Sequence, residues 1–336
     1  MSAMSATMRG RSLLKVTDLT DGEFVWLLDL AAQLKREKVR GRRGTRLAGR
    51  NIALVFEKHS TRTRCAAAVA AADEGGYTEY LSGDAIHLGK KESVIDTAKV
   101  LGRLFDGIMF RGYRQSTVEA LAAHSGVPVW NGLTDTAHPT QTLADLLTVQ
   151  ECLGTLRGLK LVYIGDGRNN VANSLMEGCV KAGMHAVNCT PPALNPDPAL
   201  VKWCRERATF NGGSFNVTAD PMEAVKDAHV IYTDVWVSMG DEAEEAERIA
   251  LLRPYQVTME LMEATGRLGA GEAIFLHCLP AFHDRETDAS RESGALEVTD
   301  AVFQAPFSKV FDQAENRMHT IKAAFVASLA TAEGGL

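Results

Sequence analysis

The fold is decided by residues 52–72, in which the apolar run IALVF at 52–56 is followed by STRTR at 60–64 and CAAAVAAA at 65–72. The apolar run has the length of a strand, and the alanine-rich run predicts a helix with Ser60 as its N-cap. The free N–H groups of a helix N-terminus bind anions, and arginine adds charge-assisted donors. The stretch therefore predicts a strand–turn–helix unit that binds a phosphate. The alternative is a capped helix with two solvated arginines.

The composition is that of an ordinary globular protein. The chain has 336 residues, of which 46% are hydrophobic and 23% are charged, and this length predicts two domains of roughly 150 residues each. The net charge of -6 argues against general binding to nucleic acid or to an anionic membrane. Any phosphate site must therefore be local.

The cysteines and the N-terminal segment bear on the compartment. The six cysteines form no CxxC pair and no other metal-ligand spacing. The apolar residues before Lys15 are too few for a signal peptide, and no segment has the length of a membrane span. We therefore expect a cytoplasmic protein.

Strands and helices alternate after the first unit. We expect strands at residues 77–81, 108–110 and 127–130, and helices at 91–104 and 118–124. This alternation predicts a parallel sheet with crossover helices.

The segment His138-Pro139-Thr140-Gln141 predicts the start of a helix that runs to about residue 153, because proline is tolerated in a first helical turn. His138 and Gln141 lie three residues apart at this helix start, so both side chains can face one ligand. The alternative is that His138 is a structural or exposed residue.

A second alternating series begins at Gly158, and it predicts a second parallel-sheet domain. The expected strands are residues 159–164, 186–189, 215–217, 230–233 and 274–276, with one helix ending near 182 and a closing helix from about 314 to 330. We therefore expect one domain at residues 1–150, joined by the C-terminal helix at about 315–336, and another at 151–314.

The turn from Gly165 to Asn170 invites a dinucleotide-binding interpretation, which the residues support poorly. Asn170 stands where the third glycine of that fingerprint belongs, and the next strand ends in Thr190 rather than in an acid. Asn169 and Asn170 suit an amino-acid head group better.

Two later strands end in residues with chemical potential. Asp234, followed by the loop Ser238-Met239-Gly240, can hold an ammonium group, although a plain loop with Asp241 as a helix cap is the alternative. Cys278 at a strand end is usually inert, and a reactive role requires a charged neighbour.

The candidate ligand-binding residues all follow strands, and they are Arg62, Arg111, Asn170, Asp234 and Cys278. Ligands of open α/β sheets bind at the carboxyl ends of the strands. We therefore predict an α/β fold of two domains, each a parallel β-sheet flanked by helices, with the active site in the cleft between them.

Five motifs, in order, together resemble the ornithine carbamoyltransferases of the aspartate/ornithine carbamoyltransferase superfamily. They are Ser60 to Arg64, Phe110-Arg111-Gly112, His138 to Gln141, Asp234 with Ser238-Met239-Gly240, and His277-Cys278-Leu279-Pro280. The resemblance extends over residues 13–329. It implies transfer of the carbamoyl group of carbamoyl phosphate to the δ-amine of L-ornithine, which gives citrulline and phosphate without a metal or an organic cofactor. It also implies a homotrimer with active sites shared between subunits.

The resemblance also assigns roles to residues. For carbamoyl phosphate, the phosphate would be held by Ser60, Thr61, Arg62 and Thr63, and the carbamoyl group by Arg111, His138 and Gln141, with Cys278, Leu279 and Arg317 nearby. The ornithine head group would be held by Asn170, Asp234, Ser238 and Met239. Catalysis would depend on Arg111, His138, Asp234 and Cys278.

One position departs from the family pattern. His87 stands where the family commonly has glutamine, in a loop that the resemblance places in a neighbouring subunit's site, in contact with carbamoyl phosphate. Imidazole can still donate a hydrogen bond there.

Other functions stay open at this point. One alternative is a carbamoyltransferase for another amine, such as putrescine or an acylated ornithine, and another is a non-catalytic sensor of phosphorylated metabolites. The sequence also leaves open whether the reaction serves arginine biosynthesis or arginine breakdown, and whether trimers assemble further.

Overall fold

A computed structural model describes residues 8–83, 86, 88, 91–237, 245–287 and 290–330. The chain divides into two compact units, of which the second is Thr148–Ala314 and the first comprises the other described residues. The boundaries fall inside two helices, α6 (Pro139–Leu153) and α13 (Val310–Leu329). Each unit contains one parallel sheet flanked by helices, so the predicted fold class is confirmed.

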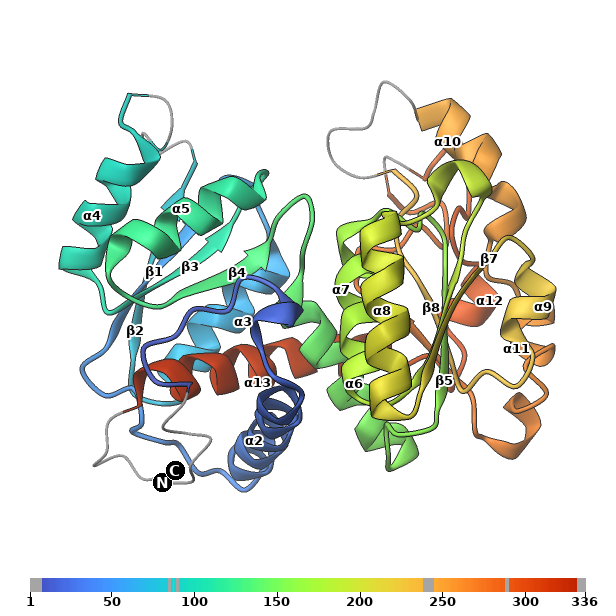
Figure 1. The fold of residues 1–336 in the computed structure, drawn as a ribbon, viewed down its shortest axis with the longest axis horizontal. Helices are drawn as coiled ribbons and strands as arrows, with labels where there is room; N and C mark the ends of the chain where they lie inside the picture. Colours follow the sequence, from blue (N-terminus) through green and yellow to red (C-terminus); the bar gives the residue numbers. More distant parts are fainter. Residues whose placement is uncertain are drawn as a thin grey trace. The chain divides into compact units, whose positions relative to one another are not determined.

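The first unit contains a four-stranded sheet in the order β2-β1-β3-β4 (Figure 1). Its parallel strands are β1 (Asn51–Phe56), β2 (Tyr77–Ser82), β3 (Gly107–Arg111) and β4 (Val129–Leu133). The chain passes from β1 to β2 on one side and then returns to β3 on the other side of β1. The carboxyl ends of β1 and β3 therefore form a topological switch point, which is where open α/β sheets bind ligands.

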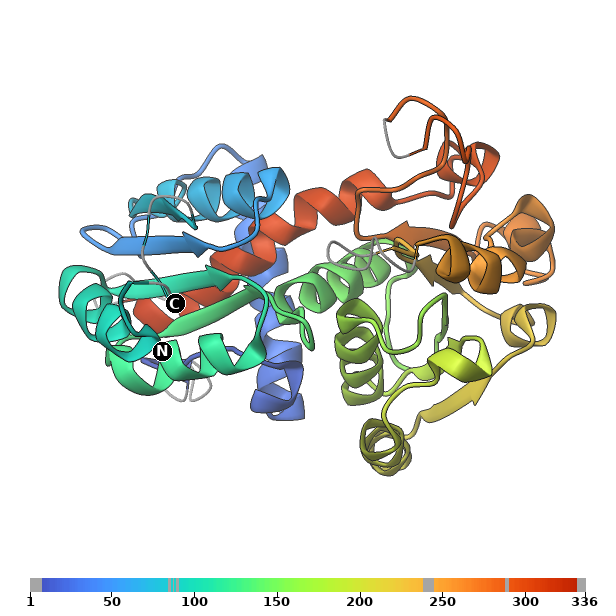
Figure 2. The ribbon, with the colours of Figure 1, turned by 90° about the horizontal axis from the view of Figure 1, so that it is seen from above.

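Helices cover both faces of this sheet, as Figure 2 shows. On one face, α4 (Val94–Leu104) and α5 (Gln115–Ser125) bury a core that includes Val55, Leu101, Ile108, Phe110 and Val118. On the other face, Phe325 of α13 packs on Trp130 of β4 with ring centroids 4.6 Å apart. The unit also contains α2 (Asp21–Val39) and α3 (Thr61–Ala72).

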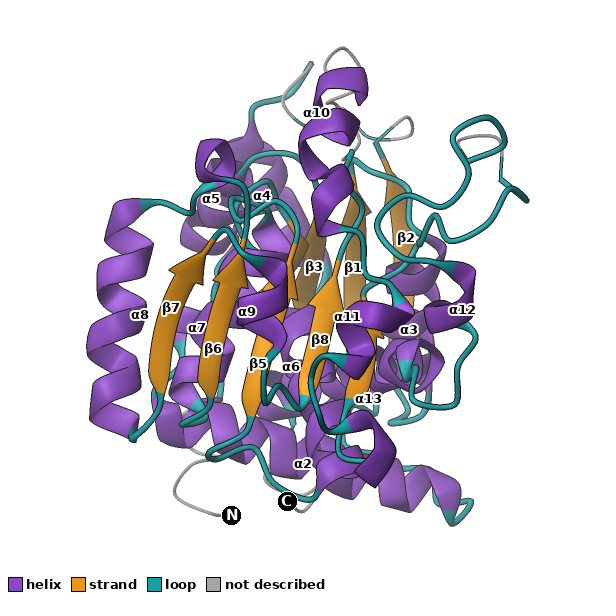
Figure 3. Cartoon of the chain, turned by 90° about the vertical axis from the view of Figure 1, so that its right-hand side faces the viewer, coloured by secondary structure: helices purple, strands orange, loops and turns teal. Residues whose placement is uncertain are grey.

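The second unit contains a five-stranded parallel sheet in the order β7-β6-β5-β8-β9 (Figure 3). Its strands are β5 (Lys160–Ile164), β6 (His185–Cys189), β7 (Ser214–Thr218), β8 (Val230–Thr233) and β9 (Ile274–His277). The chain builds β6 and β7 on one side of β5 and then returns to β8 on the other side. The switch point of this sheet therefore lies at the carboxyl ends of β5 and β8.

Figure 3 shows α7 (Asn170–Lys181) behind the second sheet and α9 (Pro221–Val225) and α11 (Met259–Glu263) in front of it. The buried core beside α9 and α11 includes Val162, Ile231, Met262, Phe275 and Val302. The helices of this unit are α7 (Asn170–Lys181), α8 (Pro198–Asn211), α9 (Pro221–Val225), α10 (Glu245–Leu252), α11 (Met259–Glu263) and α12 (Asp300–Phe303). Short 3₁₀ helices occur at Val16–Asp18, Pro192–Leu194, Arg253–Tyr255 and Leu268–Ala270. Among the described residues, we find no helix with both the length and the apolar character needed to cross a membrane.

Several predicted helix boundaries were wrong. The helix predicted from residue 91 begins at Val94, because Ser93 caps it by accepting a hydrogen bond from the Asp96 N–H at 3.0 Å. The closing helix begins at Val310 rather than near residue 314, because Val310 is buried in the core of the second unit. Packing, which local sequence does not encode, thus extended this helix by one turn.

Candidate active site

The N-terminus of α3 has the capped geometry that the sequence predicted. The Ser60 hydroxyl accepts a hydrogen bond from the Thr63 backbone N–H at 3.2 Å. Thr61 is exposed and Arg62 is half-buried at the start of this helix. The first turn of α3 therefore lies at the switch point of the first sheet with its backbone N–H groups directed out of the helix end.

The buried Thr63 hydroxyl is the point at which two distant arginines meet. Arg111, the last residue of β3, donates from Nη1 to Thr63 Oγ1 at 3.4 Å, and Arg317 of α13 donates from Nη2 to the same oxygen at 2.9 Å. Both arginine side chains are more than nine-tenths buried. Two guanidinium groups held inside the protein make a strong site for an anion.

His138 lies beside this cationic cluster. Burial, followed by the positive charges of Arg317, Arg111 and Arg62, holds the pKa of His138 well below its usual range. The imidazole is therefore neutral at physiological pH, and it can donate one hydrogen bond without adding a further positive charge. Gln141, in the first turn of α6, accepts from Arg317 Nη1 at 3.0 Å.

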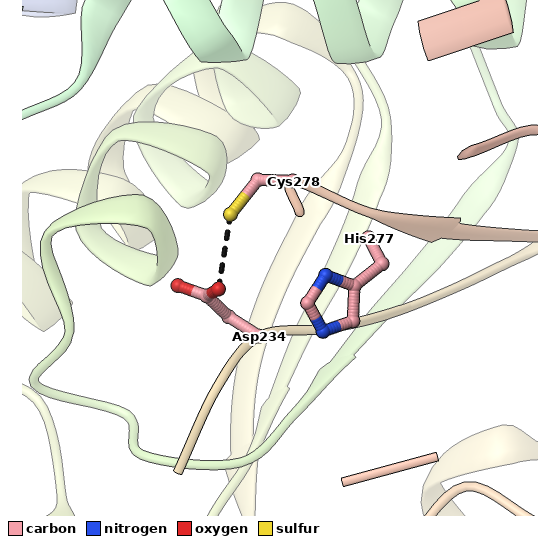
Figure 4. A group of neighbouring side chains, drawn as sticks. All are labelled: Asp234, His277 and Cys278. Carbon is pink, nitrogen blue, oxygen red and sulfur yellow. Dashed lines mark hydrogen bonds between the residues drawn. The ribbon is translucent and has the colours of Figure 1, made fainter. Parts of the chain in front are cut away.

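The second unit brings Asp234 and Cys278 together at the carboxyl ends of β8 and β9 (Figure 4). The Cys278 thiol donates to Asp234 Oδ1 at 2.9 Å. Burial raises the pKa of Asp234, whereas the hydrogen bonds from the Cys278 thiol and the Val235 N–H oppose that rise. Asp234 is a negative neighbour, whereas a nucleophilic thiol requires a positive one, so Cys278 acts here as a hydrogen-bond donor.

His277 and Glu297 fix the turn that carries Cys278. His277 Nδ1 accepts from the Leu279 backbone N–H at 3.0 Å, so the ring proton lies on Nε2 and is donated to Glu297 Oε1 at 3.1 Å. Both side chains are fully buried, and Glu297 also accepts from the Phe282 backbone N–H at 2.7 Å. These bonds hold Leu279 in the left-handed region, at φ 54, which is uncommon for a residue of this size. Sequence reasoning missed Glu297, because no spacing links it to His277.

Asn169, which the sequence indicated together with Asn170 as suited to an amino-acid head group, contacts Asp234 directly. Its Oδ1 caps α7 by accepting from the Val171 N–H at 2.7 Å, and its Nδ2 donates to Asp234 Oδ2 at 3.1 Å. The predicted Asn170 is the first residue of α7, at the carboxyl end of β5. The Asn-Asn pair was the available signal, but only the structure separates the two roles.

The predicted residues fall into two groups and a remainder. Ser60, Thr61, Arg62, Thr63, Arg111, His138, Gln141 and Arg317 lie in the first unit, and Asn170, Asp234, Cys278 and Leu279 lie in the second. His87, Ser238 and Met239 lie outside the described residues, as does the rest of segment 238–244 before α10. The roles assigned to the residues of both groups, and to these three, stay predictions.

Among the described residues, two groups bring three potential metal-ligand atoms within 4.8 Å of one another. The first is Asp234 with His277 and Cys278, in which the thiol already donates to the carboxylate. The second is His283 with Asp284 and Asp300, in which His283 Nδ1 lies 2.7 Å from Asp300 Oδ1 and the ring stacks on Phe303. In each group, two of the three side chains contact each other directly.

Comparison with known families identifies this arrangement of two sheets and two groups of polar residues. Residues 11–151 match the carbamoyl-P binding domain of aspartate/ornithine carbamoyltransferases, and residues 157–328 match the Asp/Orn binding domain. The chain belongs to the aspartate/ornithine carbamoyltransferase family. The family predicted from the motifs is therefore confirmed.

Individual relatives point to one branch of this family. The chain is 56% identical over 328 residues to a catabolic ornithine carbamoyltransferase of Bacillus licheniformis, with 96% of this chain and 97% of that protein aligned. It is 54% identical over 328 residues to the catabolic enzyme of Staphylococcus aureus, with 96% and 97% aligned. The solved ornithine carbamoyltransferase of Pyrococcus furiosus matches with a TM-score of 0.89 at 43% identity, covering 98% of this chain and 99% of that chain. The enzyme of Thermus thermophilus matches with a TM-score of 0.80 at 43% identity, covering 95% and 98%.

Proposed function

We propose that this chain is an enzyme that transfers the carbamoyl group of carbamoyl phosphate to the δ-amine of L-ornithine, giving L-citrulline and phosphate in arginine metabolism. The observation that carries this proposal is the buried convergence of Arg111 and Arg317 on Thr63, beside the capped N-terminus of α3. A small dianion is the ligand that such a group of donors favours. The carboxylate–thiol pair of the second unit supplies groups suited to an amine substrate.

In this proposal, the first unit binds carbamoyl phosphate. Ser60, Thr61, Arg62 and Thr63 hold the phosphate through hydroxyl groups, the N–H groups of α3 and the Arg62 guanidinium. Arg111 and the neutral His138 donate to the carbonyl oxygen of the carbamoyl group. That oxygen gains negative charge as the amine attacks, so donors fixed in advance lower the barrier. Removing one such donor typically costs about 10²–10³ in kcat.

The second unit binds ornithine. Asn170 and Asp234, together with Ser238 and Met239, hold the amino-acid head group, and Cys278 and Leu279 lie beside the reacting amine. An alkylammonium has a pKa near about 10 in water, so it must lose a proton before it attacks. A buried site disfavours the ammonium form. The new C–N bond then forms as the C–O bond to phosphate breaks, and Asp234 or a phosphate oxygen accepts the proton that the nitrogen loses.

We propose the catabolic direction, because the relatives that are 54–56% identical are named catabolic. In that direction, citrulline and phosphate yield ornithine and carbamoyl phosphate during arginine breakdown. Deleting the gene should abolish growth on arginine as the energy source without creating an arginine requirement. A strain that instead requires arginine would assign the chain to biosynthesis.

The six free cysteines fit the reducing cytoplasm, which we propose as the location of the protein.

We also propose a homotrimer in which the loop around His87 completes a neighbouring site. Sedimentation should give a mass three times that of the 36.4 kDa chain, or a multiple of that mass. Mixed refolding of Arg62→Ala chains with His87→Ala chains should restore activity, since a hybrid trimer contains one site with neither change. Hybrids of verified composition that stay inactive would remove His87 from the active site.

The substrate is tested with a panel of amines. Purified protein should form a ureido product fastest from L-ornithine and at least about 10²-fold more slowly from putrescine or Nα-acetylornithine, because each lacks a charge that the head-group site pairs. A preference for putrescine or acetylornithine would assign the chain to that amine. Binding of carbamoyl phosphate without product from any amine would indicate a sensor.

A further inference from the structure

A line of hydrogen bonds runs from the anion site into α6. Arg317 Nη1 donates to Gln141 Oε1 at 3.0 Å, and Gln141 Nε2 donates to Asp145 Oδ1 at 2.7 Å. Gln141 and Asp145 lie one helical turn apart, and Asp145 is fully buried. None of the motifs used in the sequence analysis includes Asp145.

The chemistry of the two ends permits only one orientation of the amide between them. A guanidinium has only donors, and a carboxylate has only acceptors. If the Gln141 amide turned over, its NH₂ would face the Arg317 donors and its oxygen would face the Asp145 carboxylate. Both contacts would be repulsive, so Arg317 and Asp145 together fix the amide with its oxygen on the Arg317 side.

We infer that Asp145 is a positioning residue that makes Gln141 an acceptor for the amino group of the carbamoyl substrate. This inference rests on the proposed function. The surrounding Ser60, Arg62, Arg111 and Arg317 supply donors for the phosphate and the carbonyl oxygen. The two N–H groups of a carbamoyl –NH₂ need acceptors instead, and the second lone pair of Gln141 Oε1 offers one.

The consequence is selectivity for a carbamoyl group over an acetyl group. The two groups have similar size and shape, but the methyl group of an acetyl compound cannot donate a hydrogen bond. A site built to receive an N–H discriminates against an analogue that lacks it, because its acceptor is then left unpaired. Asp145 sets this discrimination through Gln141, without touching the substrate itself.

The test uses two stable ligands that differ only in this group, phosphonoacetamide and its methyl ketone counterpart phosphonoacetone. Binding of each, and of inorganic phosphate, is measured by calorimetry in the absence of ornithine. In the wild-type enzyme the amide should bind about tenfold more tightly than the ketone. In Asp145→Asn the preference should fall to about twofold or less, with phosphate affinity unchanged within twofold.

A double variant exchanges the donor and the acceptor of the hydrogen bond between positions 141 and 145. In Asp145→Asn combined with Gln141→Glu, the new amide at position 145 can donate to the new carboxylate at position 141, whose other oxygen accepts from Arg317. The net charge of the pair is unchanged, and the amide-over-ketone preference should return toward the wild-type ratio. Asp106→Asn is the matched control, because Asp106 accepts from Arg50 and from the Asn51 N–H at the opposite end of β1. It should leave all three affinities unchanged.

The inference is overturned if Asp145→Asn keeps the wild-type preference, if phosphate affinity falls as far as amide affinity, or if the double variant recovers nothing over Asp145→Asn. The proposed function fails separately, through absence of citrulline formation. In that case the ligand preference in the absence of ornithine can still be measured.

Discussion

Thr63 illustrates what a single side chain contributes to this protein. The resemblance to the carbamoyltransferases implied that its hydroxyl holds a phosphate, and the structure shows that this hydroxyl accepts hydrogen bonds from Arg111 and Arg317. These arginines come from β3 and from α13, so no local pattern links them to Thr63. A hydroxyl that accepts from two cations keeps them aligned before substrate arrives, which is how a preorganised anion site lowers the cost of binding.

Thr63→Val removes this hydroxyl with almost no change in shape. We expect kcat/KM for carbamoyl phosphate to fall about tenfold to a hundredfold, since about 1.5–3 kcal/mol is typical of hydrogen bonds to charged groups. KM for ornithine should change little. Thr97→Val is the control, because Thr97 is also buried and donates to Glu92 in a different part of the first unit. Steady-state kinetics that do not separate the two variants would contradict the role of Thr63.

We propose that Cys278 contributes to activity through the hydrogen bond that it donates to Asp234. Cys278→Ser keeps a donor, whereas Cys278→Ala leaves the buried carboxylate without it at a cost of about 1–3 kcal/mol. We expect Cys278→Ala to lose about tenfold more in kcat than Cys278→Ser. Comparable losses in the two variants would show that the sulfur, rather than the donated hydrogen bond, is what matters.

At the scale of elements, each helix that begins at a switch point also organises a site. Asn169, the N-cap of α7, donates a hydrogen bond from its amide nitrogen to Asp234. Its amide oxygen caps the helix by accepting from the Val171 N–H. The Asp197 cap of α8 accepts from the Ala199 N–H at 2.6 Å and belongs to no site described here. The two caps therefore separate helix stabilisation from substrate binding.

Asn169→Ala and Asp197→Ala should each lower the free energy of unfolding by about 1 kcal/mol, the usual value of a helix N-cap. Only Asn169→Ala should also raise KM for ornithine, because only Asn169 orients Asp234. Urea unfolding and ornithine kinetics on both variants check this. An equal rise in KM in both variants would attribute the effect to general loosening of the second unit.

The elements also show which features of the protein can be predicted from the sequence. Strand runs such as residues 52–56 and caps such as Ser60 are local, so their patterns predicted them. Arg317 and Glu297 complete the two groups through contacts across 254 and 20 positions of sequence, respectively. Composition and periodicity give no information on such contacts, and only the resemblance to a family suggested Arg317. No signal suggested Glu297 or Asp145.

At the scale of the whole molecule, buried histidines make stability depend on pH. Burial is the main reason why the pKa of His138 lies well below its usual range. Burial is also the main reason why the pKa of His319 is lowered to about 4. In the unfolded chain, both imidazoles take up a proton near about pH 6.5. Below that pH the unfolded state binds more protons than the folded state, so stability falls as pH falls. Asp234, whose pKa is raised, acts in the opposite sense.

We therefore expect the urea midpoint of the first unit to decrease between about pH 6.5 and pH 4, where these histidines titrate only in the unfolded chain. His319→Gln, which still can donate to Glu315, should reduce the slope. Circular dichroism at fixed ionic strength measures the urea midpoint at each pH. A midpoint that rises as pH falls from 7 to 5 would contradict this linkage.

The proposed reaction joins the carbamoyl carbon to the δ-nitrogen of ornithine. The direct measurement is NMR of a reaction containing ¹³C-labelled carbamoyl phosphate, ornithine labelled with ¹⁵N at the δ position, and the purified protein. We expect a ¹³C signal of citrulline that is split by one-bond coupling to ¹⁵N, with one phosphate released per citrulline. An unsplit ¹³C signal, or phosphate release without citrulline, would contradict the proposed reaction.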